Sequence, residues 1–176
     1  GKINPVADGH MTFAGTISLQ PDIFEKVLEA TARSLKHHGF TEIYFVGDSG
    51  WNQDSQSAVA KKLNEEWRGE GVTIASLNDY YAKNGQTQYL LDQGYGMEEI
   101  GLHAGMRDTS EMLAAHPKGV RLQAGNRIEG LPSGFSGHAS KATVKIGRKM
   151  LKLKVDAAVS QIREIRGVHD EVARLR

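Results

Sequence analysis

Two short apolar segments, "EIYFV" at 42–46 and "VTIASL" at 72–77, constrain the fold more than any other feature of the sequence. The first is apolar on both faces, which is typical of a strand in a covered parallel sheet. Apolar residues at helical spacing predict a helix near 53–68 between them. A strand, a helix and a second strand in this order form the βαβ unit of an α/β domain. We therefore expect a three-layer α/β/α fold with a mostly parallel sheet.

The same rules predict the remaining elements. Pro21 fits the first turn of a helix, where its missing N–H costs nothing, and Gly39 stops the apolar period that follows, so a helix is expected near 21–38. A length of 176 residues is typical of a single domain. The other expectations are a helical excursion at 78–100, a short helix at 109–116, a last helix from Lys141 to about Arg166, and short strands at 16–19 and 119–123.

Composition excludes several classes of function. The net charge of +1 gives no electrostatic basis for a nucleic-acid or membrane partner. No stretch approaches the roughly 18 apolar residues of a membrane span, and the N-terminus has no apolar signal region. We expect a cytoplasmic protein, or a periplasmic or secreted one whose signal has been removed. Because the chain has no cysteine, a metal would be held by His, Asp, Glu, backbone or water, which suits zinc, manganese or iron(II).

The stretch "GLHAGMRDTSEML" at 101–113 combines a histidine, a carboxylate and two glycines. An imidazole can transfer a proton near pH 7, and a carboxylate that hydrogen-bonds it fixes the tautomer. His103 and Asp108 are therefore candidate catalytic residues, and Asp108 is also a candidate metal ligand. The alternatives are a hydrogen-bonded structural histidine and an aspartate that caps the helix starting at Thr109.

A second polar, glycine-rich stretch, "GDSGWNQ" at 47–53, directly follows a predicted strand. Ligands bind outside the carboxyl ends of the strands in open parallel sheets. Asp48 is thus a candidate metal ligand, and Trp51 and Asn52 are candidate substrate-binding residues. Asp48 could instead belong to a helix-capping turn, Trp51 could contact a partner, and Asn52 could simply start the next helix. His10 is a further substrate-binding candidate, although a lone loop histidine is more often a surface residue.

Three blocks of the sequence resemble the creatininase (creatinine amidohydrolase) family. They are "GHMTFAGTISLQPDIFEKVLEATARSLKHHGFTEIYFVGDSG", "HAGMRDTSEMLAAHPKGVR" and "SGFSGHASKATVKIGRKML", and they follow one another in the family's order between about 9 and 166. The resemblance implies an α/β/α fold in ring-like homo-oligomers and a metal-dependent hydrolysis of amide-type C–N bonds. It places His103 at the position of the family's proton carrier and Asp108 at the acidic position that follows.

The chain departs from the family pattern at two points. Ser49 stands where the family has a metal-binding histidine, and serine is a poor ligand for zinc or manganese. Family members also begin with a strand and loop that carry further metal ligands, and this chain starts after them. A catalytic metal needs about three protein ligands and an open position. We therefore expect either a homo-oligomer or companion chain that supplies the missing part, or a chain without a metal.

Two functions are consistent with these residues. The first is a creatininase-like, metal-dependent amidohydrolase that acts on an amide or cyclic amide bond of a small molecule. The second is a non-catalytic binding or assembly module that has kept the scaffold after losing the metal site. Ser49 and the absent N-terminal ligands favour the second function, and His103 with Asp108 favours the first.

Overall fold

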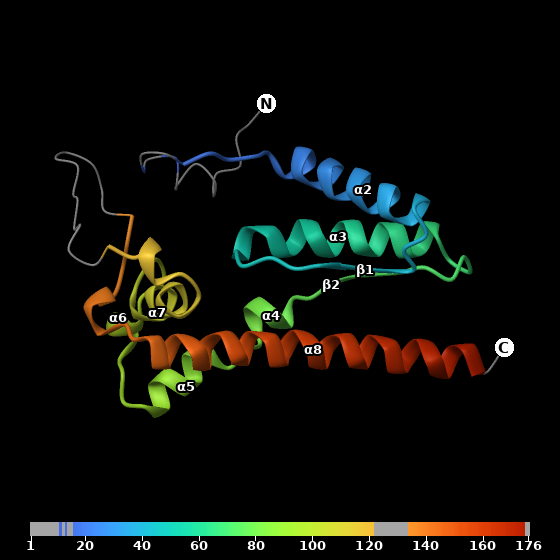
Figure 1. The fold of residues 1–176 in the computed structure, drawn as a ribbon. Coiled ribbons are helices and arrows are strands. Elements are labelled where there is room, and N and C mark those ends of the chain that lie inside the picture. Colours follow the sequence, from blue (N-terminus) through green and yellow to red (C-terminus); the bar gives the residue numbers. More distant parts are fainter. Residues whose placement is uncertain (1–10, 12, 14–15, 122–133, 175–176) are drawn as a thin grey trace. The chain divides into compact units, whose positions relative to one another are not determined.

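A computed structural model describes residues 11, 13, 16–121 and 134–174 of the chain (Figure 1). The chain groups into two compact units. The single domain expected from its length stays a prediction. The first unit is built mainly on Ile17–Lys83 and Ala158–Arg176, and the second on Asn84–Ala157 with Thr12–Thr16. No helix in the described ranges is long and apolar enough to cross a membrane.

The first unit is the predicted βαβ arrangement. Its elements are helix α2 (Pro21–His37), strand β1 (Glu42–Phe45), helix α3 (Gly50–Glu66), strand β2 (Thr73–Ser76) and the short helix α4 (Asp79–Ala82). The two strands pair in parallel, with Glu42 opposite Thr73 and Phe45 opposite Ser76. An α/β fold with a parallel sheet is thereby confirmed, although the described part of the sheet has only these two strands. Helix α3 begins three residues earlier than the predicted 53.

The core of this unit lies between the strands and the two long helices. Leu63 and Ala32 are fully buried, and Ile74 and Trp67 almost so. Helix α2 begins at Pro21 as predicted, and Gly39 follows its end with a φ of +87°, a backbone conformation that favours glycine. Further core residues are Ile43, Phe45, Val59 and Ala60.

Side chains cover the edge of β2 that faces away from β1. The Asn64 amide of α3 donates to the Ile74 carbonyl at 2.5 Å, and its oxygen accepts the Ile74 N–H at 3.1 Å. Gln161 donates to the Ser76 carbonyl at 3.2 Å and accepts the Asp79 N–H at 3.1 Å. Unpaired backbone groups at a sheet edge attract other chains, so these two side chains protect the edge of β2.

The second unit is helical. It contains α5 (Gln86–Asp92), α6 (Met97–Ile100), α7 (Met106–Ala115), the 3₁₀ turns η1 (Pro117–Gly119) and η2 (Ala139–Lys141), and the first part of α8 (Val144–Arg174), which continues into the first unit. The predicted excursion at 78–100 is helical as expected, and the last helix is confirmed. Leu90, Ile100, Met106 and Met150 form the core.

One predicted strand is wrong, and a second is wrong in its described part. Residues 16–19 form no strand, because they pair with no neighbouring strand in the described structure. In the predicted strand at 119–123, Gly119 ends η1, Val120 and Arg121 belong to no strand, and the remaining two residues lie outside the described ranges. Both segments have β-branched or apolar residues, but a strand forms only where a partner supplies the ladder of hydrogen bonds.

A buried charge network ties α5, α7 and α8 together in the second unit. Lys154 Nζ donates to Glu111 Oε2 at 2.8 Å, and the side chains are only 6% and 11% exposed. The Gln86 amide donates to the other Glu111 oxygen at 2.5 Å and to the Met150 carbonyl at 3.0 Å. Buried charges persist only when they are paired and hydrogen-bonded, and this pair meets both conditions.

Candidate functional site

The loop 101–105, which joins α6 to α7, carries the candidate histidine on a fixed backbone. Ala104 has a φ of +48°, a left-handed conformation that costs a residue with a side chain about 1–2 kcal/mol. Its N–H donates to Asp108 Oδ2 at 3.0 Å, and its carbonyl accepts the Thr109 hydroxyl at 2.9 Å. The first turn of α7 thus holds both backbone groups of the strained residue. Strain of this kind clusters at functional sites.

His103 itself is exposed, and its backbone is also held from outside the loop. Its N–H donates to Ser136 Oγ at 3.2 Å, and its carbonyl accepts the Ser136 N–H at 2.8 Å. The structure therefore presents an exposed imidazole on a backbone whose direction is set by hydrogen bonds on both sides. This arrangement suits a group that must meet a substrate in one orientation.

Asp108 lies in the first turn of α7, where both of its oxygens accept hydrogen bonds. Oδ2 accepts the Ala104 N–H, and Oδ1 pairs with Arg107 Nε at 3.1 Å. This is close to the capping alternative expected from the sequence, with the helix starting at Met106 rather than Thr109. The carboxylate in this position stabilises the loop that carries His103.

The turn that follows β1 in the first unit carries the other predicted site residues. Asp48 is exposed, and Trp51 is 54% exposed although it lies in the first turn of α3. The Gln53 amide donates to the carbonyls of Gly47 and Ser49 at 3.0 and 2.9 Å, so it braces the turn. The N–H of Asn52 donates to the Ser49 carbonyl at 3.2 Å, which places Asn52 at the start of the helix.

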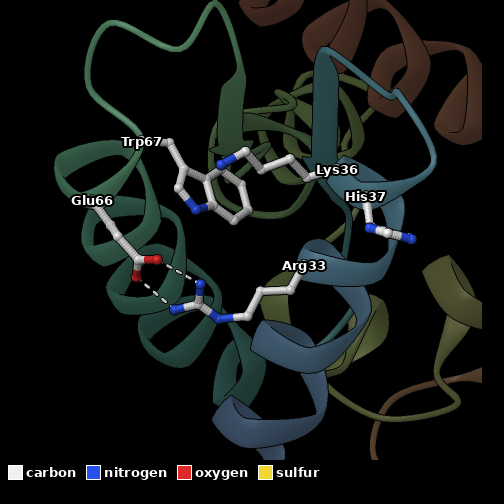
Figure 2. Close-up of a pocket in the computed structure, with 5 residues that line it drawn as sticks. All are labelled: Arg33, Lys36, His37, Glu66 and Trp67. Carbon is white, nitrogen blue, oxygen red and sulfur yellow. Dashed lines mark hydrogen bonds and ion pairs between the residues drawn. The ribbon is translucent and has the colours of Figure 1, made fainter.

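A surface pocket of about 340 Å³ lies between the ends of α2 and α3 (Figure 2). Arg33 makes two hydrogen bonds of 2.5 Å to Glu66, and Lys36 lies over the Trp67 ring with its nitrogen 4.6 Å from the centroid. The hydrogen bonds that Arg33 donates to Glu66, and then those to Glu29, raise the pKa of Arg33. These charges pair with one another and join the two helices, and none of the predicted site residues lines this pocket.

The predicted residues thus fall in different parts of the chain. His103 and Asp108 belong to the second unit, whereas Asp48, Trp51 and Asn52 belong to the first. His10 lies outside the described residues. Sequence reasoning missed Ser136 and the bracing role of Gln53. Ser136 could have been found from the sequence by its place in "SGFSG", where the neighbouring glycines allow another backbone to approach closely.

A resident metal would need several ligating side chains close together. Among the residues that the structure describes, no three His, Cys, Asp or Glu side chains are grouped so that they could hold a metal ion. Asp108 already accepts two hydrogen bonds within its own unit. The described side chains therefore do not fit a resident metal by themselves.

Solved structures of creatininases resemble the chain in fold. A crystal structure of creatinine amidohydrolase (creatininase) matches with a TM-score of 0.65 and 21% identity, covering 86% of this chain and 66% of its own. A mutant creatininase complexed with creatine matches with a TM-score of 0.64 and 23% identity, covering 86% and 68%. A manganese form of creatininase gives 0.65 and 23%, covering 86% and 67%. The chain thus spans about two thirds of the length of these proteins. No match was found among curated proteins.

The sequence also matches a family model over most of its length. The model, described as creatininase (creatinine amidohydrolase), covers residues 5–162. This range includes both candidate segments, the turn after β1 and the loop before α7. The protein belongs to the creatininase family.

Proposed function

We propose that the protein is a creatininase-type amidohydrolase that cleaves an amide or cyclic amide C–N bond of a small molecule, with His103 as the proton-transfer group. The observation that carries this proposal is the exposed imidazole on a loop whose backbone is fixed at residues 102–104. Membership of the creatininase family supports the reaction class. The neighbour complexed with creatine supports a small-molecule substrate.

In this reaction His103 would take a proton from the attacking water and give it to the leaving nitrogen. A neutral imidazole accepts the first proton, and the imidazolium that results donates it to the nitrogen, so the histidine returns to its starting state. A positioned group of this kind accelerates such reactions by about 10²–10⁴-fold. Asp108 acts indirectly, because its carboxylate holds the Ala104 N–H beside the histidine.

Asp48 of the first unit and Asp108 of the second stay predicted metal ligands, each within its own unit. Creatininase neighbours include zinc and manganese forms, and a divalent metal would polarise the substrate carbonyl and activate water. Because the described side chains do not form such a site alone, we propose that other groups complete it. Another protomer of a homo-oligomer, or a companion chain, would supply them.

A non-catalytic binding module is the second candidate function. Two observations favour it: the Asp108 oxygens already accept hydrogen bonds, and no metal-binding group is found among the described residues. Such a module would bind a small amide through the same loop without converting it. Its affinity would depend on His103, and added metal would not change the affinity.

Hydrolysis of creatinine and related cyclic amides, assayed with and without Zn²⁺ or Mn²⁺, separates the two functions. As an amidohydrolase, the protein should lose about 10²–10⁴-fold in kcat/KM in His103→Asn. His116→Asn, which changes another exposed histidine of the same unit, should leave the rate unchanged. Binding of creatinine in calorimetry without any metal-dependent turnover would instead establish the binding module. Elemental analysis for zinc and manganese, together with the mass of the oligomer, would test whether another protomer or chain completes the metal site.

A further inference from the structure

Ser136 contacts the candidate histidine loop through three backbone groups. Its hydroxyl oxygen accepts the N–H of Leu102 at 2.8 Å and that of His103 at 3.2 Å, and its own N–H donates to the His103 carbonyl at 2.8 Å. A serine hydroxyl has two acceptor lone pairs, so one side chain satisfies two successive amides. The contact joins residues 33 and 34 positions apart, which makes it a tertiary clamp rather than a local turn.

Glycines bring the two backbones into direct contact. A Cβ on Gly101 would lie 2.0 Å from the Ser136 carbonyl oxygen, and one on Gly137 would lie 2.6 Å from the Gly101 Cα. Both glycines also have positive φ, of +70° and +92°. No other residue fits at either position without moving the chain, so the backbone approach places the Ser136 hydroxyl over the two amides.

A second attachment holds the Ser136 segment in place independently of that hydroxyl. The His138 N–H donates to the Glu99 carbonyl at 2.8 Å, and Lys141 forms an ion pair with the Glu99 carboxylate. Glu99 also accepts the Gly96 N–H at 2.9 Å. Loss of the Ser136 hydroxyl would therefore free the Leu102 and His103 amides while the segment stays attached to α6.

We propose that Ser136 is a positioning residue that orients His103 through its backbone. The proposal rests on the assigned role of His103 as the proton-transfer group. The hydroxyl fixes the His103 amide and the Ser136 N–H fixes its carbonyl, so the peptide planes on both sides of His103 keep one direction. Ala104, which follows in a strained conformation, is held separately by its hydrogen bonds with Asp108 and Thr109.

The test compares Ser136→Ala, which removes the acceptor, with Ser136→Thr, which keeps it. Ser140→Ala is the matched control, because Ser140 lies exposed in η2 of the same segment. In Ser136→Ala, amide hydrogen exchange at Leu102 and His103 should accelerate about 10-fold, as loss of a hydrogen bond implies. The kcat for C–N hydrolysis should fall by about 10-fold or more with KM little changed, since misorientation impairs the chemical step. Ser136→Thr should restore both values.

Each outcome decides one question. Unchanged exchange in Ser136→Ala, or faster exchange with unchanged kcat, would overturn the positioning role. The three-bond couplings that report the His103 χ1 angle should become averages over several rotamers in Ser136→Ala but not in Ser140→Ala. A single His103 rotamer retained in Ser136→Ala would also overturn the positioning role. Hydrolysis that survives in His103→Asn would refute the proposed function instead. Amide hydrogen exchange and the χ1 couplings are measured without turnover, so they still decide whether Ser136 orients the imidazole.

Discussion

Replacement of Lys154 by methionine should destabilise the second unit more than any surface substitution. The ammonium of Lys154 lies 2.8 Å from Glu111 Oε2, and both side chains are almost fully buried. At an effective dielectric constant of about 20, two unit charges at this distance attract by roughly 6 kcal/mol, which offsets the cost of removing them from water. Lys154→Met removes the attraction but leaves the Glu111 carboxylate buried, with the Gln86 amide as its remaining donor among the described residues.

The expected loss is about 3–5 kcal/mol in the free energy of unfolding, the usual cost of breaking a buried pair from one side. That is a large share of the 5–15 kcal/mol typical of a folded protein. Adding Glu111→Gln to Lys154→Met should recover most of the loss, because the double variant buries no net charge and the new amide can still accept from Gln86. The double variant is therefore the matched control for the single one.

Urea denaturation followed by far-UV circular dichroism measures this loss, with hydrogen exchange of 106–115 locating it. Tryptophan fluorescence provides an internal comparison, because Trp51 and Trp67 both belong to the first unit. A loss below about 1 kcal/mol in Lys154→Met would show that this pair stabilises the unit no more than a surface ion pair does. A double variant as unstable as the single one would show that the buried charge does not cause the loss.

Three further predictions concern the loop and its supports. Gly147→Ala would place a Cβ 1.8 Å from the Ser110 carbonyl oxygen and should lower the free energy of unfolding by about 3 kcal/mol. Gly167→Ala is the control: a Cβ at Gly167 meets open space, and alanine favours the helix, so Tm should rise slightly. The hydrogen bond from Lys141, and then that from the Gly96 amide, hold the pKa of Glu99 below its ordinary 4.5. Because the folded state then binds fewer protons than the unfolded state, Glu99 adds to the free energy of unfolding above pH 4.5, and this addition is lost as the pH falls below that value. The urea midpoint of Glu99→Gln should therefore fall less on acidification than the midpoint of the wild type. An equal fall of the two midpoints would contradict the lowered pKa. Ala104→Gly should leave stability within about 1 kcal/mol of the wild type, while Ala104→Val should cost about 1–2 kcal/mol; equal melting curves for the two would show that the left-handed backbone carries no strain.

The sequence predicted the first unit well because local periodicity determines it. The apolar strands at 42–46 and 72–77, the proline at the start of α2 and the glycine after its end are signals that act within a few residues. The segment at 16–19 failed for a physical reason. Its β-branched residues favour an extended chain, but no described strand offers it a partner.

The arrangement of the candidate site was less predictable. His103 and Asp108 could be named as candidates, yet spacing alone left open whether the carboxylate faces the imidazole, a metal or the helix end. The structure shows it accepting the Ala104 N–H. The contact of Ser136 with the loop joins residues 33 positions apart and depends on the fit between Gly101 and Gly137. Neither feature produces a periodic pattern in the sequence.

Chemical rescue of His103→Ala shows whether the imidazole transfers the proton. The variant removes the imidazole and leaves the backbone bonds of the loop in place, so imidazole added to the solution can occupy the vacated space and move the proton. With Zn²⁺ or Mn²⁺ supplied, we expect creatinine hydrolysis to fall by about 10²–10⁴-fold and to rise again with imidazole concentration. Hydrolysis by His103→Ala at the wild-type rate, or a lost rate that imidazole does not restore, would contradict it.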